Sequence, residues 1–173
     1  MKSVSHRIPI VVSACLLGWK VRYDGKDKRH DRALALLQGE WLVVPVCPEV
    51  AVGLGVPRQP LELVSGAKGV RIQGAGKKGV DVTEALNHYA RQIAEREPAI
   101  AGMISKSRSP SCGLAVSLHD PQGGILPEKV QGRFVHSLLE CLPGLPVIEE
   151  TDIDEDRKWQ AFIDAVREYA RHR

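Results

Sequence analysis

Three of the four cysteines stand where a parallel sheet would bring them together. Cys15 and Cys47 directly follow apolar, β-branched runs that are typical of buried strands, and Cys112 lies in the loop after a third such run. Because the carboxyl ends of parallel strands open at one edge of the sheet, we expect these three thiols to converge there. Cys141 differs, since it falls on the apolar stripe of a predicted helix and is interpreted as a small core residue.

Three convergent thiols are suited to soft metals, and several chemical interpretations stay open on their spacing alone. A 4Fe-4S cluster is usually held by four thiolates, so three would leave one iron free to bind a substrate. A zinc site would need a fourth ligand, for which His30 is the nearest candidate. Such a zinc-stabilised or metal-free module could bind RNA or a nucleotide without catalysis. A thiol enzyme with a histidine base would use one cysteine and leave two unexplained.

The loop that carries Cys112 is rich in groups that can contact a ligand. Residues 105–113, Ser-Lys-Ser-Arg-Ser-Pro-Ser-Cys-Gly, combine four hydroxyls, two cations and the thiol, and Pro110 restricts the backbone. An ordinary surface turn is the alternative, because Ser, Pro and Gly are common turn residues. The Gly- and Pro-containing stretch at 53–58, which comes after Cys47, is also expected to run in irregular backbone close to a ligand.

Alternating strands and helices must position these residues. Their order favours an α/β, Rossmann-like fold with a mainly parallel sheet flanked by helices and the site at the C-terminal edge of the strands. A β-hairpin is expected at 61–73. The Gly-rich stretch at 74–79 lacks the Ser or Thr that comes after Gly-Lys in a phosphate-binding loop, and we interpret it as an exposed turn. The predicted strands are 8–13, 41–46, 100–104, 114–118 and 145–148, and the predicted helices are 31–38, 81–97, 133–142 and 154–171.

The composition is that of a globular chain of moderate charge. The 173 residues are 43% hydrophobic and 26% charged, with a formal net charge of +3, and we expect one domain over residues 1–173. This charge is well short of that of a dedicated nucleic-acid-coating protein. The apolar run at 8–17 is shorter than the ~18 residues that span a bilayer and lacks a cleavage site. We therefore expect a cytoplasmic protein without a membrane partner, whose cysteines are ligands, nucleophiles or core residues rather than disulfides.

Six motifs occur in a specific order along the chain. They are Val-Ser-Ala-Cys-Leu-Leu-Gly at 12–18, Arg-Tyr-Asp-Gly at 22–25, Val-Pro-Val-Cys-Pro-Glu-Val at 44–50, Gly-Leu-Gly-Val-Pro-Arg at 53–58, Asp-Val-Thr at 81–83 and Lys-Ser-Arg-Ser-Pro-Ser-Cys-Gly at 106–113. Together they resemble the thiouracil desulfidase (TudS-type) family over nearly the whole chain. The ending at 143–150 also resembles the equivalent domain of larger proteins that remove sulfur from thiouridine in transfer RNA.

The resemblance implies an iron-sulfur desulfidase that removes sulfur from a thiolated pyrimidine, of the thiouracil or thiouridine type, by hydrolysis with release of hydrosulfide. It implies a 4Fe-4S cluster held by the three strand-end cysteines, with one open iron. It further implies Glu49 as the acid/base residue and Ser109 as its hydrogen-bonding partner, with Ser111 nearby. The alternative for Glu49 is a structural carboxylate that caps a helix or pairs with Arg58.

Two departures from the family pattern bear on the metal and the substrate. Val21 stands where many relatives have a further cysteine, so a thiol there cannot be a required ligand in this chain. The larger transfer-RNA-acting relatives have a second domain that these residues lack, so we expect a free thiolated base or nucleoside rather than transfer RNA. An RNA would also need a basic track, and solvated surface charge is the alternative for the residues that could form one. Those residues are Lys20, Arg22, Lys26, Lys28, Arg29 and His30.

Overall fold

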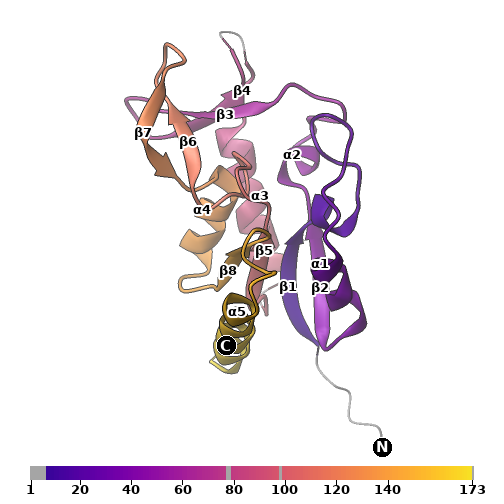
Figure 1. Ribbon diagram of the computed structural model, residues 1–173. Coiled ribbons are helices and arrows are strands. Elements are labelled where there is room, and N and C mark those ends of the chain that lie inside the picture. Colours follow the sequence, from indigo (N-terminus) through magenta and orange to yellow (C-terminus); the bar gives the residue numbers. More distant parts are fainter. Residues whose placement is uncertain (1–6, 77–78, 98, 173) are drawn as a thin grey trace, which may run out of the picture.

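The structure is a computed structural model that describes residues 7–76, 79–97 and 99–172. Two separate sheets and the helices between and around them make up the fold, with the second sheet at the top of Figure 1 and the parallel sheet below it. Within the described residues, no helix is both long and apolar enough to cross a membrane.

The central sheet confirms the predicted parallel arrangement. Its strands are β1 (Ile8–Ser13), β2 (Trp41–Val46), β5 (Gly102–Ser105) and β8 (Val147–Glu149), all parallel and in the order β2-β1-β5-β8. The chain builds outward from β1 to β2 on one side and then adds β5 and β8 on the other. The strand order therefore reverses between β1 and β5, and open α/β sheets bind ligands outside the carboxyl ends of the strands at such a switch point.

Helices cover both faces of this sheet because side chains alternate along its strands. From β1, Ile10 and Val12 belong to a core cluster with Phe162, whereas Val11 belongs to a second cluster with Phe134. Helices α1 and α5 thus pack on one face, and α3 and α4 pack on the other. The helices are α1 (Asp31–Ala35, continued by a 3-10 turn at Leu36–Gln38), α2 (Pro48–Ala51), α3 (Thr83–Arg96), α4 (Arg133–Cys141) and α5 (Asp156–Arg171).

The second sheet has the order β4-β3-β6-β7 and is mixed. It contains the predicted hairpin, as β3 (Leu61–Val64) and β4 (Arg71–Gly74), and adds β6 (Val116–His119) and β7 (Ile125–Val130). The sequence analysis missed β7 because most of this strand is exposed and it shows no apolar alternation. One face of the sheet packs on Leu86 of α3.

The predicted bounds agree with the structure for two of the strands of the parallel sheet. The strands predicted at 8–13 and 41–46 match β1 and β2, whereas β5 begins two residues later than predicted. The reason is that Ile100 and Ala101 are fully buried without belonging to the strand, so burial extended the apolar pattern. The predicted turn at 74–79 includes residues 77 and 78, which lie outside the described residues.

Candidate active site

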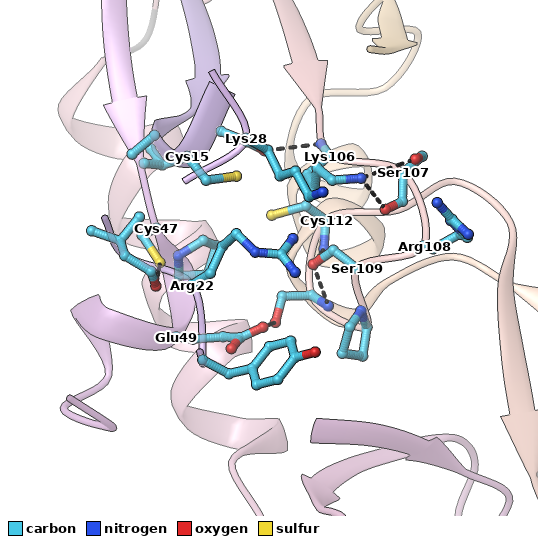
Figure 2. A pocket seen from close by; sticks show the side chains of 18 of the residues that line it. Cys15, Arg22, Lys28, Cys47, Glu49, Lys106, Ser107, Arg108, Ser109 and Cys112 are labelled. Atoms are coloured by element: carbon cyan, nitrogen blue, oxygen red, sulfur yellow. Dashed lines mark hydrogen bonds between the residues drawn. The ribbon is translucent and has the colours of Figure 1, made fainter. Parts of the chain in front are cut away.

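A cavity of about 390 Å³ lies at the carboxyl edge of β1, β2 and β5, at the switch point of the sheet. Its volume is in the range of small-molecule sites, which is ~300–1,000 Å³. The segments directly after the three strands form most of its wall, as Figure 2 shows. All the site residues that the sequence predicts line this one cavity, whereas Cys141 does not. They are Cys15, Cys47, Glu49, Ser109, Ser111 and Cys112.

Each of the three thiols in the cavity is held by a different local structure. Cys15 lies in a 3-10 turn (Ala14–Leu17), and Cys47 stands at the N-terminal cap of the short helix α2. Cys112 lies in the loop after β5, where its N–H donates to the hydroxyl of Ser109 at 3.1 Å. Figure 2 shows the sulfur atoms of Cys15 and Cys112 pointing toward one another, with that of Cys47 further away on the side of Arg22. The convergence expected from the strand ends is therefore present.

These thiols are costly to ionise without a compensating charge. Burial, and next the charge of Cys47, raises the pKa of Cys15 to about 11. Burial likewise raises the pKa of Cys47 and, more strongly, that of Cys112. Thiolates are the metal-binding form of cysteine, so three of them in this space require a positively charged partner. A bound metal group supplies such a charge.

Three thiols that line one cavity are a donor set of the kind that suits an iron-sulfur group. Among the residues that the structure describes, no three His, Cys, Asp or Glu side chains gather closely enough to hold one metal ion. The three thiols instead surround the cavity. No described histidine lines it, and Nε2 of His30, the candidate fourth zinc ligand, lies 3.3 Å from Asp154 Oδ2 instead. Among the described residues, the cavity therefore holds neither the histidine expected as a fourth zinc ligand nor one that could serve as the base of a thiol enzyme.

The carboxylate of Glu49 is held by both of its oxygens. Arg58 Nε donates to Oε2 at 2.7 Å, and the hydroxyl of Ser111 donates to Oε1 at 2.9 Å. The side chain of Glu49 is 12% exposed and lines the cavity. The ion pair with Arg58 that the structural alternative predicted is present, but Glu49 also lines the cavity that the three thiols line.

In this structure the hydroxyl that bonds Glu49 is that of Ser111, whereas the sequence predicts Ser109 in that place. The hydroxyl of Ser109 instead accepts the backbone N–H groups of Ser111 and Cys112, at 3.3 and 3.1 Å. A serine readily accepts the amides two and three residues ahead in a turn. Ser109 thus shapes the turn that carries the thiol, and Ser111 is directed at the carboxylate.

A network behind the cavity wall fixes the loop after β5. Lys106 lines the cavity, and its Nζ lies 2.5 Å from Glu150 Oε1. Glu150 also accepts the N–H of Ser107 at 2.6 Å and its hydroxyl at 2.8 Å. Although burial acts in the opposite direction, the hydrogen bonds from Lys106 and Ser107 hold the pKa of Glu150 below its ordinary value. Glu150 is not predicted as a site residue. The one feature of the sequence that points to it is its position in the ending at 143–150, which resembles the family.

Positive charge predominates around the cavity. Five cationic side chains line it, and Glu49 is the carboxylate among them. Arg108 has a backbone φ of 58°, a left-handed conformation that is uncommon outside glycine and is found at functional sites. Val21, which stands where many relatives have a cysteine, also lines the cavity. Its carbonyl accepts a hydrogen bond from the thiol of Cys47 at 3.6 Å. The five cations are Arg22, Lys28, Arg58, Lys106 and Arg108.

The fold and the site together define an α/β protein with a cysteine-lined pocket at the switch point of a parallel sheet. Comparison with known proteins gives the family. Residues 10–150 match the model of the 2-thiouracil desulfurase family, and the chain belongs to it. The solved structure of the 4Fe-4S-dependent thiouracil desulfidase TudS is similar, with a TM-score of 0.66 and 30% identity over 88% of this chain and 97% of that one. The uncharacterized protein YbbK of Bacillus subtilis (strain 168) is 31% identical over 152 residues, which are 84% of this chain and 98% of that protein.

Proposed function

We propose that this chain is an iron-sulfur-dependent desulfidase that hydrolyses the carbon-sulfur bond of a thiolated pyrimidine. The substrate is a free base or nucleoside of the thiouracil or thiouridine type, and residues 1–173 act as one domain. The observation that carries the proposal is the convergence on a single cavity of three thiols and the carboxylate of Glu49, which is held by two hydrogen bonds. Membership of the 2-thiouracil desulfurase family and the similarity to TudS support the same reaction. We place the protein in the cytoplasm, because free thiols persist in reducing compartments.

In this proposal Cys15, Cys47 and Cys112 hold a 4Fe-4S cluster as its three protein ligands. When bound, the cluster supplies an open iron, a soft site suited to the sulfur of a thiocarbonyl. The cations around the cavity offset the negative charge of three thiolates, since an opposite charge nearby favours the ionised form. The structural similarity to a 4Fe-4S-dependent enzyme supports an iron-sulfur cofactor, and the three cysteines that line the cavity are the ligands we propose for it.

Glu49 acts as the general base and acid. Each carboxylate oxygen can accept more than one hydrogen bond, so Oε1 can accept a water molecule while it still accepts the hydroxyl of Ser111. Glu49 takes a proton from that water, and the water oxygen bonds to the ring carbon that carries the sulfur. As the carbon-oxygen double bond forms and the carbon-sulfur bond breaks, the departing sulfur takes the first proton from Glu49, and the carboxylate then takes the remaining proton of the attacking water and releases it to solvent. Water and thiouracil thus give uracil and hydrogen sulfide, which ionises to hydrosulfide, without net electron transfer.

The test is to incubate anaerobically purified protein with 2-thiouracil and, separately, with 4-thiouridine. We expect uracil or uridine and hydrosulfide to form in equal amounts, in proportion to bound cluster and not in cluster-free protein. A protein with a full complement of iron and sulfide that converts neither compound contradicts the proposal. Turnover that survives iron removal but is abolished by thiol alkylation identifies a thiol enzyme instead.

A further inference from the structure

One guanidinium group connects the proposed acid/base residue with a proposed cluster ligand. Arg58 Nε donates to Glu49 Oε2 at 2.7 Å, and its Nη2 lies 4.0 Å from Cys47 Sγ. The third nitrogen, Nη1, donates to the carbonyl of Gly55 at 2.8 Å. The side chain of Arg58 is only 5% exposed. All three nitrogens therefore have a partner, and two of these partners belong to the candidate active site.

The backbone also fixes the place of Arg58. Its N–H donates to the carbonyl of Tyr23 at 2.9 Å, which ties it to a loop that also lines the cavity. Gly55 has a φ of 73°, a conformation natural to glycine, and its carbonyl faces the guanidinium. Because the guanidinium is planar and rigid, fixing one of its edges on Gly55 also fixes the directions of the other N–H bonds.

Building on the proposed function, we propose that Arg58 is a positioning residue that sets the orientation of the Glu49 carboxylate relative to the Cys47 sulfur. It acts on turnover through Glu49, without itself contacting the reacting atoms. It acts on the cluster through Cys47, because a hydrogen bond to a ligand sulfur is one of the features that set the reduction potential of an iron-sulfur group. A salt bridge that served only the fold would not need to reach the thiol.

The first test is Arg58→Lys, which keeps the charge but cannot bond three partners in one plane. We expect full iron and sulfide, a kcat lower by about 10-fold or more because small displacements of a catalytic group are costly, and a KM within about 2-fold of the parent. In a Glu49→Gln background, where the carboxylate is already absent, the same substitution should not lower kcat further. An unchanged kcat for Arg58→Lys, or the same fold-loss in both backgrounds, overturns the positioning role.

The reduction potential of the cluster is a second readout that does not depend on turnover. We expect Arg58→Lys to lower it in both backgrounds, because the contact with Cys47 does not run through Glu49. The matched control is Arg71→Lys, at a guanidinium that pairs with Asp81 at 2.8 Å and does not line the cavity. This control should leave both the potential and kcat unchanged. A potential that stays the same in Arg58→Lys contradicts the contact with the ligand sulfur.

If Arg58→Lys does not assemble a cluster, Glu49→Asp supplies the test from the other side of the ion pair. It draws the carboxylate back from the guanidinium and leaves Arg58 in place, so kcat should fall while the potential stays that of the parent. Parent-like turnover in Glu49→Asp overturns the inference. A parent protein that binds a full cluster but converts no thiolated pyrimidine contradicts the proposed function alone, and the potentials of the Arg58 variants then still decide the contact with Cys47.

Discussion

Two buried ion pairs flank the cavity, and they are built alike. Glu49 pairs with Arg58 at 2.7 Å and Glu150 with Lys106 at 2.5 Å, and the two carboxylates are 12% and 13% exposed. Each also accepts a serine hydroxyl. The difference is that Glu49 lines the cavity, whereas Glu150 lies behind the loop that forms the wall. The same pair of charges can therefore serve chemistry in one place and support in the other.

The supporting role of the second pair extends over the whole loop after β5. Glu150 accepts the backbone N–H of Ser107 near the start of the loop, and its neighbour Glu149 accepts that of Leu114 at 2.7 Å just beyond the end. Two consecutive residues at the end of β8 thus hold both ends of the segment that carries Cys112. A carboxylate bonded to backbone amides fixes shape, whereas one that opens on a cavity can exchange protons.

The effect of Glu49→Gln on turnover should distinguish the roles of the two ion pairs most strongly. The amide keeps the shape but cannot accept a proton, so hydrosulfide release per cluster should fall by roughly 10²-fold or more, the usual scale for a general acid/base. Iron and sulfide content and the binding of thiouracil should stay those of the parent. Parent-like turnover would show that Glu49 is a structural carboxylate like Glu150.

Glu150→Gln should have the opposite profile. It removes the negative charge that neutralises Lys106 in a buried setting, which is expected to lower the free energy of unfolding by about 1–3 kcal/mol. Turnover per assembled cluster should change by less than in Glu49→Gln, since Glu150 does not line the cavity. Urea unfolding of cluster-free protein measures the first effect. A loss of turnover in Glu150→Gln as large as that in Glu49→Gln would erase the distinction between the two ion pairs.

Acid should remove the same contribution in the parent. The folded-state pKa of Glu150 lies below its ordinary value near 4.5, so its stabilisation is complete above that value and is lost as the pH falls through the lower folded-state value. Unfolding free energies of the parent and of Glu150→Gln should therefore differ most near neutral pH and converge in acid. A difference that stays constant from pH 7 to pH 3 contradicts this assignment.

Ser109 and Ser111, the two serines beside Pro110 in the loop, should show the mildest effects. Ser111→Ala removes the donor to Glu49 Oε1 and should lower kcat by several-fold, in line with about 1 kcal/mol for one hydrogen bond. Ser109→Ala removes the acceptor of two backbone N–H groups and should mainly reduce cluster content. Steady-state kinetics normalised to bound iron separate the two. The reverse pattern would restore Ser109 as the partner of the carboxylate.

Residues at the ends of buried strands are the part of the site that the sequence predicts best. The convergence of Cys15, Cys47 and Cys112 requires only that three buried strands be parallel, and buried strands leave a clear apolar pattern. The exposed strand β7 leaves no such pattern. Nor can spacing decide which of two nearby serines contacts Glu49, because that depends on the turn that both of them form. The contact between Glu150 and the loop depends on which strand lies beside β5, and this neighbour is a property of the sheet order.

The proposed function depends most on whether Cys15, Cys47 and Cys112, and not Cys141, hold an iron-sulfur cluster in this cavity. The direct test is the iron and acid-labile sulfide content of anaerobically purified Cys15→Ala, Cys47→Ala, Cys112→Ala and Cys141→Ala. The first three should lose the cluster, because each removes one of three ligands. Cys141→Ala should retain it, since that side chain packs in the core around α4 and does not line the cavity. A cluster retained without Cys112, or lost without Cys141, would contradict the proposed ligand set.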